Sequence, residues 1–162
     1  MKILVTGGAG FIGGNFVLKQ VLQEGNKILN FDKLTYAGNI DTLESVIGND
    51  KYQFVQGDIC QRNKVKNVLS QFQPDVIINF AAESHVDRSI DGPFEFIQTN
   101  IVGTAVLLDE ANNYYKTLTG EMKAGFRFLH VSTDEVYGDV IRGRSIFHFI
   151  ARLSDETSRI RH

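Results

Sequence analysis

The chain has 162 residues, of which 43% are hydrophobic and 22% are charged, and its formal net charge is -2. This composition is typical of one globular domain and excludes disordered, collagen-like and coiled-coil proteins. A net charge so close to zero gives no basis for a nucleic-acid or membrane partner, and no apolar run reaches the roughly 18 residues of a membrane span.

Short β-branched runs alternate with helix-length segments along most of the chain. The predicted strands are nearly continuous apolar runs, as expected for strands buried on both faces. They are Lys2–Thr6, Lys27–Phe31, Tyr52–Gln56, Val76–Phe80 and Arg127–Ser132. Apolar residues at helical spacing lie between them, and the longest predicted helix has its apolar face at Phe96, Ile97, Ile101, Ala105 and Leu108. The alternation predicts an α/β fold, a Rossmann-type doubly wound parallel sheet that stops after about five strands.

The first predicted strand runs into a glycine-rich loop, Gly7-Gly8-Ala9-Gly10-Phe11-Ile12-Gly13, which fits GxGxxG from Gly8 or GxxGxxG from Gly7. Glycines at this spacing are weak evidence alone, but these follow a predicted strand and open a predicted helix. Without a Cβ the backbone can turn tightly and approach a pyrophosphate, and the N–H groups at the helix start offer it hydrogen-bond donors. The loop therefore predicts a dinucleotide site.

Two aspartates follow the next two predicted strands. Asp32 ends the second strand, 19 residues after Gly13. Its carboxylate would accept hydrogen bonds from the adenosine ribose and repel a 2′-phosphate, so NAD is favoured over NADP, although Lys33 follows directly. Asp58 follows the third strand, at the edge where ligands bind in such sheets, and a helix cap is its alternative role.

The fifth predicted strand runs into Ser132-Thr133-Asp134-Glu135-Val136-Tyr137-Gly138. Two neighbouring carboxylates and a hydroxyl at the carboxyl end of a central strand suit acid/base catalysis beside a nicotinamide. From these residues alone, a solvated turn is an equally good interpretation.

Six segments of the chain form a more specific pattern. They are TGGAGFIG at 6–13, DKLTYAGN at 32–39, GDIC at 57–60, AAESHVDRSIDGP at 81–93, TNIVGT at 99–104 and VSTDEVYGD at 131–139. Together they resemble the dTDP-glucose 4,6-dehydratases, a group within the extended short-chain dehydrogenase/reductase family. The resemblance covers residues 1 to about 139, and the Asp134-Glu135 pair separates it from the related sugar-nucleotide epimerases. It implies a lyase that uses NAD to convert dTDP-glucose to dTDP-4-keto-6-deoxyglucose.

The resemblance also implies roles for individual residues. The cofactor site would combine the loop glycines Gly7, Gly10 and Gly13 with Phe11, Ile12, Asp32, Lys33, Leu34, Thr35, Asp58, Ile59, Phe80, Ala81, Ala82, Glu83, Ser84 and Thr99. Ser84 and Thr133 would contact the sugar nucleotide. Oxidation at C4 of the hexose acidifies the C5 proton, which Glu135 would remove as general base while Asp134 protonates the departing C6 hydroxyl. Thr133, Asp134 and Glu135 are thus the candidate catalytic residues.

The segment Glu83-Ser84-His85-Val86-Asp87 places an acid, an imidazole and an acid at alternate positions. No second cluster completes a metal coordination shell, and the family resemblance assigns the segment to cofactor and substrate binding. We therefore expect no metal site. The single cysteine, Cys60, excludes an internal disulfide and is interpreted as a small apolar core residue. Since the start of the chain lacks the features of a secretory signal peptide, we expect a cytoplasmic location.

The family's remaining catalytic element is a Tyr-x-x-x-Lys pair on the helix after the fifth strand, where the tyrosine takes the proton from the C4 hydroxyl. None of the five tyrosines in the chain is followed by lysine four positions later. They are Tyr36, Tyr52, Tyr114, Tyr115 and Tyr137. This absence, together with the missing substrate domain, predicts a truncated dehydratase.

The charge changes sign along the chain. Residues 1–141 carry a net charge of -5, whereas residues 142–162 carry +3, with five arginines and no lysine. We therefore divide the chain into an incomplete NAD-binding domain at 1–140 and a divergent Arg-rich tail at 141–162, for which a shifted reading frame is our hypothesis. The alternative is an amphipathic helix, because Ile146, Phe149, Ile150 and Leu153 fall at helical spacing.

Three functions are therefore open for this chain: a dehydratase, an NAD-binding module without turnover, and a fragment without function. The family resemblance makes the dehydratase the first of these, and the third rests on a parallel sheet that stops after five strands and leaves an exposed edge. The family's homodimer would use the predicted helix around 95–116, and it is doubtful for a truncated chain. The expected partner is the nucleotide sugar.

Overall fold

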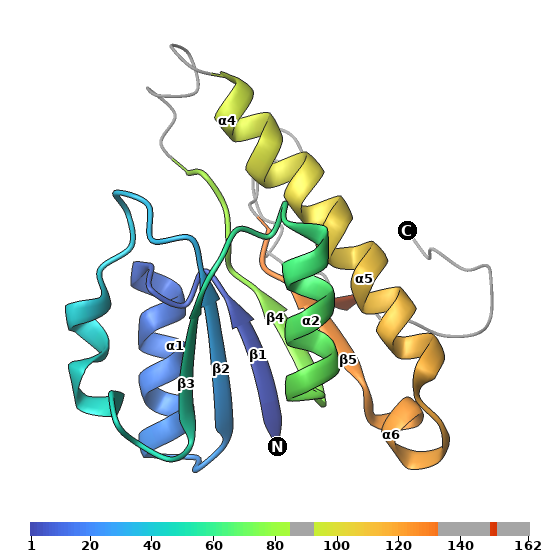
Figure 1. Cartoon of the computed structure of the whole chain (residues 1–162). Coiled ribbons are helices and arrows are strands. Elements are labelled where there is room, and N and C mark those ends of the chain that lie inside the picture. The colour runs from blue at the N-terminus through green and yellow to red at the C-terminus, as the bar shows by residue number, and fades with distance from the viewer. Residues whose placement is uncertain (85–92, 133–149, 152–162) are drawn as a thin grey trace, which may run out of the picture.

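A computed structural model describes residues 1–84, 93–132 and 150–151. These residues form a twisted sheet with helices on both faces (Figure 1). The strands are β1 (Lys2–Thr6), β2 (Lys27–Asp32), β3 (Tyr52–Gln56), β4 (Val76–Asn79), β5 (Arg127–His130) and β6 (Ile150–Ala151). The first five are parallel, in the order β3-β2-β1-β4-β5. The predicted Rossmann-type parallel sheet is confirmed.

The strand ends differ slightly from the predicted ones, because the hydrogen-bond ladder sets where each strand stops. β2 extends to Asp32, which pairs with Gln56 of β3. β4 and β5 end earlier than predicted, and one backbone hydrogen bond follows the end of each strand. The Phe80 N–H donates to Thr6 O at 2.9 Å, and the Val131 N–H donates to Asn79 O at 3.0 Å. All five carboxyl ends meet at one edge of the sheet, at the top in Figure 1.

Helical segments cover both faces of the sheet. They are α1 (Phe11–Leu22), the 3₁₀ helix η1 (Ile40–Val46), α2 (Arg62–Phe72), α4 (Pro93–Ile97), the π-helical segment η2 (Gln98–Gly103), α5 (Thr104–Thr117) and α6 (Gly120–Gly125). η1 lies between β2 and β3, where a helix-length segment is expected, whereas α6 is not among the predicted elements. α1 and η1 pack on one face with the apolar side chains of one core cluster, and α2 and α5 pack on the other face with a second cluster. Burial on both faces explains the nearly continuous apolar runs of β1, β2 and β4, whereas the edge strand β3 exposes Gln53 and Gln56.

The segments α4, η2 and α5 follow one another directly and form one long helix that projects beyond the carboxyl edge of the sheet (Figure 1). The predicted apolar face of this helix is wrong. Phe96, Ile97 and Ile101 are exposed, and of the predicted positions Leu108 alone packs against the core. The inward positions are spaced by four residues instead, at Thr99, Gly103, Leu107, Ala111 and Tyr115.

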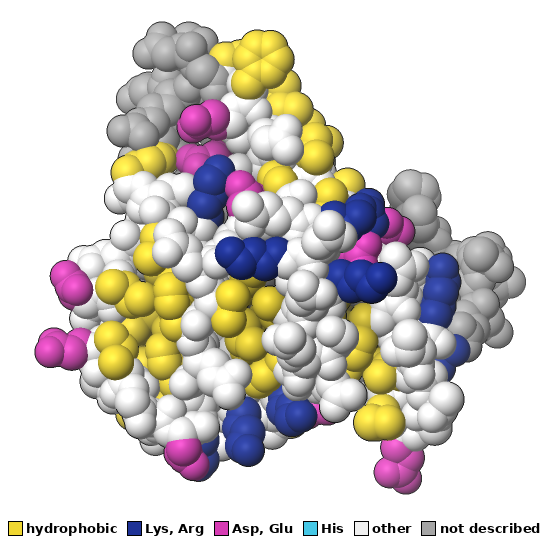
Figure 2. Space-filling model, viewed as in Figure 1, with side chains coloured by type: hydrophobic (Ala, Val, Ile, Leu, Met, Phe, Trp, Pro, Cys, Tyr) yellow, Lys and Arg dark blue, Asp and Glu magenta, His cyan; other side chains and the backbone are white. Residues whose placement is uncertain are grey.

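The π-helical segment explains this spacing. In an α-helix each four-residue step advances about 40° beyond a full turn, so positions four apart spiral around the surface. A π-helical turn contains more residues, so a four-residue step there covers less than a full turn and offsets this rotation. Thr99 and Leu107 therefore face the same side of the long helix, and the apolar side chains near its start point outward, where Figure 2 shows hydrophobic atoms along its upper end.

β6 was not predicted: it is antiparallel to β5, with Ile150 opposite Leu129 and Ala151 opposite Phe128. An edge strand offers unpaired backbone groups to any nearby segment, which accounts for this short pairing. The amphipathic helix considered for the tail is therefore wrong at Ile150, and the rest of the tail lies outside the described residues. No helix in the described parts of the chain is long and apolar enough to cross a membrane.

Candidate functional site

The glycine loop joins β1 to α1 at the carboxyl edge of the sheet. Gly7 has φ +72°, which favours glycine, and a Cβ on it would lie 2.5 Å from the Ala81 nitrogen. A Cβ on Gly13 would lie 2.3 Å from the Gly7 carbonyl oxygen. Gly10 caps the N-terminus of α1 and supplies no side-chain hydrogen bond to it. The first N–H groups of α1 thus lack a side-chain cap, and with the helix dipole they suit a phosphate group.

Asp32 is buried where β2 meets this loop. Its Oδ2 accepts a hydrogen bond from the Ala9 N–H at 2.8 Å, and its Oδ1 accepts one from the Leu34 N–H at 2.8 Å. Leu34 has φ +56°, a left-handed conformation that leucine rarely adopts. The carboxylate therefore holds the glycine loop and the loop after β2 together. Each oxygen keeps a second lone pair, which suits ribose hydroxyls.

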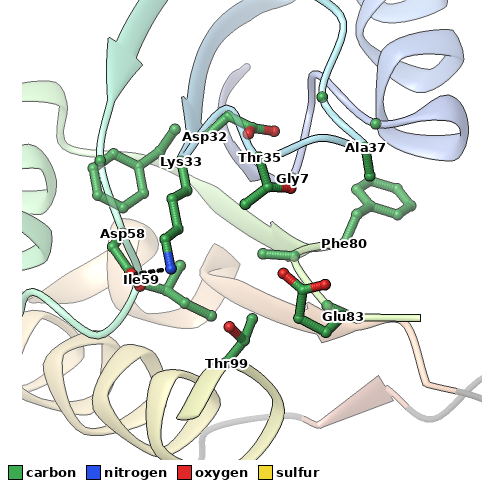
Figure 3. Close-up of a pocket in the computed structure, with 16 residues that line it drawn as sticks. Gly7, Asp32, Lys33, Thr35, Ala37, Asp58, Ile59, Phe80, Glu83 and Thr99 are labelled. Carbon is green, nitrogen blue, oxygen red and sulfur yellow. Dashed lines mark ion pairs between the residues drawn. The ribbon is translucent and has the colours of Figure 1, made fainter. Parts of the chain in front are cut away.

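Lys33 and Asp58 form an ion pair across the carboxyl ends of β2 and β3, with 2.9 Å between Lys33 Nζ and Asp58 Oδ2 (Figure 3). Burial favours a higher pKa for Asp58, but hydrogen bonds from the Cys60 N–H and from Lys33 outweigh it and leave this pKa below 3.8. The hydrogen bond to Asp58 likewise raises the pKa of Lys33 above 10.5, against the effect of burial. Both groups are therefore charged at neutral pH.

Cys60, predicted as a core residue, is only half-buried, and its Sγ donates to the Gln98 carbonyl oxygen at 3.2 Å. Burial raises the pKa of this thiol above 9.0. The thiol is therefore protonated at neutral pH and helps to join the β3–α2 loop to the long helix.

A pocket at the carboxyl edge brings most of the predicted cofactor residues together (Figure 3). The predicted residues that line it are Gly7, Gly10, Asp32, Lys33, Thr35, Asp58, Ile59, Phe80, Ala81, Ala82, Glu83 and Thr99. The Lys33–Asp58 pair lies on one side of the pocket, and Phe80 and Glu83 lie on the opposite side. The pocket thus joins segments that are far apart in the sequence.

Some predicted site residues do not line this pocket. Gly13 and Leu34 are not among its lining residues, and Ser84 and the side chains of Phe11 and Ile12 are exposed. Four lining residues were not predicted: Phe31, Ala37, Gly38 and Gly57. The candidate catalytic residues Thr133, Asp134 and Glu135, like His85 and Asp87, lie outside the described residues.

A chain of polar side chains, buried at Thr6 and Asn79 and partly buried at His130, crosses β1, β4 and β5 near the same edge. Thr6 Oγ1 donates to Asn79 Oδ1, and Asn79 Nδ2 lies 2.9 Å from His130 Nδ1. Because the Asn79 amide nitrogen can only donate, His130 Nδ1 accepts and the ring carries its proton on Nε2. This chain of bonds fixes the neutral imidazole two residues before Ser132.

Burial lowers the pKa of His130 below 6.5, so we expect its neutral form to stabilise the fold in a pH-dependent way. Above the unfolded-state pKa, this stabilisation by the neutral His130 is fully present. It is lost as the pH falls from the unfolded-state pKa through the lower folded-state pKa. Urea unfolding of the wild type and of His130→Gln between about pH 7.5 and 5.5 measures it. Wild type should lose more stability on acidification than the variant, whereas parallel curves would contradict this assignment.

Comparison with known proteins places the chain among sugar-nucleotide enzymes. The family model described as GDP-mannose 4,6 dehydratase matches residues 4–146. A dTDP-glucose 4,6-dehydratase of Xanthomonas campestris pv. campestris is 59% identical over 135 residues, which are 83% of this chain and 38% of that protein.

Two solved structures are similar as well. A dTDP-glucose 4,6-dehydratase of Bacillus anthracis in complex with NAD matches with a TM-score of 0.73 and 37% identity, over 96% of this chain and 45% of that one. That of Streptomyces venezuelae, with NAD bound, matches with a TM-score of 0.74 and 42% identity, over 88% of this chain and 42% of that one. The chain thus spans less than half the length of these relatives.

Proposed function

Since the chain belongs to the GDP-mannose 4,6-dehydratase family, we propose that it binds NAD and forms the cofactor half of a dTDP-glucose 4,6-dehydratase. The observation that carries this proposal is the pairing of an uncapped glycine turn with the buried carboxylate of Asp32 at the carboxyl edge of a parallel sheet. The high identity to dTDP-glucose 4,6-dehydratases supports the choice of substrate.

Different residues of the chain bind different parts of the cofactor. The N–H groups at the start of α1 bind the pyrophosphate, and Asp32 accepts hydrogen bonds from the adenosine ribose and disfavours a 2′-phosphate. The Lys33–Asp58 pair is neutral overall and closes the adenosine side. Phe80, Ala81 and the neighbouring backbone form the opposite wall, which Gly7 contacts closely.

Bound NAD supplies a hydride acceptor at C4 of the hexose and a hydride donor for C6. Glu135 removes the C5 proton, and Asp134 donates a proton to the C6 hydroxyl as the C6–O bond breaks and water leaves. Ser84 and Thr133 contact the sugar nucleotide. These roles follow the family resemblance, and they are supported by the way β5 directs the chain towards the carboxyl edge beside β4.

A specific observation favours a second candidate for these 162 residues alone: NAD binding without turnover. None of the five tyrosines precedes a lysine by four positions, so no residue pair of the family type takes the proton from the C4 hydroxyl. The third candidate, a fragment without function, would neither bind NAD nor unfold cooperatively.

The exposed apolar side chains of the long helix support a homodimer of the family type. They are Phe94, Phe96, Ile97, Ile101 and Val102. Burial of these side chains against a second copy would remove a contiguous apolar surface from water. The homodimer is proposed for the full-length enzyme and not for this truncated chain, and the cytoplasmic location stays a prediction.

Product formation tests the proposed reaction. The chain is incubated with NAD and dTDP-glucose, and the 4-keto-6-deoxy sugar is followed by NMR, alongside a chimera that joins residues 1–139 to the remaining part of the Xanthomonas enzyme. We expect product from the chimera, none from its Glu135→Gln variant, and none from the chain alone. A folded chimera without activity would contradict the dehydratase assignment, and rapid turnover by the chain alone would contradict the role given to the missing pair.

A further inference from the structure

The wall of the pocket beyond β4 has little secondary structure to hold it. The last ladder bond of β4 is that from the Phe80 N–H to Thr6 O. Residues 81–84 then leave the sheet without regular structure, and Ala81, Ala82 and Glu83 still line the pocket. Gly7 contacts the Ala81 backbone at one end of this wall. Its other end, at Glu83, needs a different anchor.

Asn100 supplies that anchor with a reciprocal pair of hydrogen bonds. Its Oδ1 accepts from the Glu83 N–H at 2.8 Å, and its Nδ2 donates to the Glu83 carbonyl oxygen at 2.9 Å. A single side chain thus satisfies both backbone groups of one residue, as a neighbouring strand would. An amide suits this pair because it carries a neutral donor and a neutral acceptor on two neighbouring atoms, whereas a hydroxyl has a single oxygen for both.

The π-helical segment places Asn100 where it can do this. Thr99 lines the pocket, and Gly103 packs so closely on Ile59 that a Cβ would lie 2.7 Å from its Cγ1. These two contacts fix the rotation of the helix on either side of Asn100. Irregular helical turns of this kind are frequent at functional sites.

Glu83 is also held from the other side of the pocket. The Tyr36 hydroxyl, in the loop after β2, donates to Glu83 Oε2 at 3.1 Å. The same residue is therefore tied to the long helix through its backbone and to the loop after β2 through its carboxylate. The β2 loop in turn begins at Asp32, which holds Leu34.

We propose that Asn100 is a positioning residue for the dinucleotide: by clamping the Glu83 backbone, it sets the pocket wall formed by residues 80–83 before the cofactor binds. This inference rests on the proposed NAD site and adds to it a residue that does not itself line the pocket. Loss of the clamp leaves the wall to be ordered on binding, and NAD affinity decreases accordingly.

The test compares Asn100→Ala, Asn100→Asp and the control Asn113→Ala, which changes an exposed asparagine of the same helix. Calorimetry measures NAD affinity, and NMR measures hydrogen exchange of the Glu83 amide without NAD. We expect Asn100→Ala to speed this exchange and to weaken NAD binding about tenfold, as the loss of two hydrogen bonds implies. Asn113→Ala should change neither.

The Asn100→Asp variant gives a signature that a general loss of stability would not. The introduced carboxylate, when ionised, accepts from the Glu83 N–H but repels the Glu83 carbonyl oxygen, whereas its protonated form restores both bonds. The affinity deficit of Asn100→Asp relative to wild type should therefore shrink as the pH falls towards the pKa of the new carboxyl group. Lys33, Asp58, Glu83 and Glu95 are present in every variant, so the ratio of the Asn100→Asp affinity to the wild-type affinity reports on the new carboxyl group.

Unchanged NAD affinity and unchanged Glu83 exchange in Asn100→Ala would overturn the inference, as would an affinity deficit of Asn100→Asp that is independent of pH. A wild-type chain that does not bind NAD would overturn the proposed function and with it the role in binding. The failure of the proposed function can be told apart from the failure of the Asn100 inference, because hydrogen exchange of the Glu83 amide is measured without NAD.

Discussion

Replacing Gly13 with alanine is expected to lower the free energy of unfolding by about 1–3 kcal/mol and to weaken NAD binding sharply. A Cβ at this position would lie 2.3 Å from the Gly7 carbonyl oxygen and 2.9 Å from the Gly8 Cα. Both atoms belong to the backbone of the loop, so the loop must shift away from the start of α1. The N–H groups that would bind the pyrophosphate then lose their arrangement.

The adjacent glycine provides a matched control. A Cβ on Gly14 would meet the Gly8 carbonyl oxygen at 3.5 Å, which is an ordinary contact. Gly14→Ala also improves helix propensity, so it should stabilise the protein by roughly 0.5–1 kcal/mol. Urea unfolding and NAD titration of both variants check the pair. Equal behaviour of the two variants would show that close packing of the loop against α1 does not matter.

Asp32→Ala is expected to reduce NAD affinity by about 100-fold, because charge-assisted hydrogen bonds to two ribose hydroxyls are lost. The variant also leaves the buried Ala9 N–H without its acceptor and releases Leu34 from its left-handed conformation. Stability should therefore decrease together with affinity. Calorimetric titration with NAD and thermal unfolding measure the two effects.

Two further variants separate charge from position. Asp32→Asn keeps one oxygen acceptor but presents an NH₂ group to the other backbone N–H, so it should also bind NAD weakly. Asp50→Asn removes an exposed carboxylate from the turn before β3, at the opposite edge of the sheet, and should leave binding unchanged. If Asp32→Ala bound NAD like the Asp50→Asn variant, the ribose role of Asp32 would be wrong.

The sheet could be predicted from the sequence because its central strands β1, β2 and β4 are buried on both faces and its glycine loop has a local signature. The long helix could not, because apolar periodicity assumes 3.6 residues per turn and the π-helical segment breaks that period. Phe96, Ile97 and Ile101 looked like a core face, yet they are exposed. Their apolar character suits an assembly surface rather than the core.

The site was predictable where its residues lie at or just after the end of a strand, as Asp32 does at the end of β2 and Asp58 does two residues after β3. The contacts between its segments were not, since the ion pair of Lys33 with Asp58 and the clamp of Asn100 on Glu83 depend on how distant segments meet. Gly57 did carry a local signal, because it directly precedes Asp58. A Cβ there would lie 2.4 Å from the Phe31 ring, which explains the glycine.

Titration of NAD into the purified 162-residue chain, followed by calorimetry, tests the central claim most directly. We predict saturable binding of one NAD per chain, with NADP bound more weakly because Asp32 repels its 2′-phosphate. The complex should also unfold at a higher temperature than the free chain. A chain that unfolds cooperatively but shows neither binding nor stabilisation by NAD would contradict the claim.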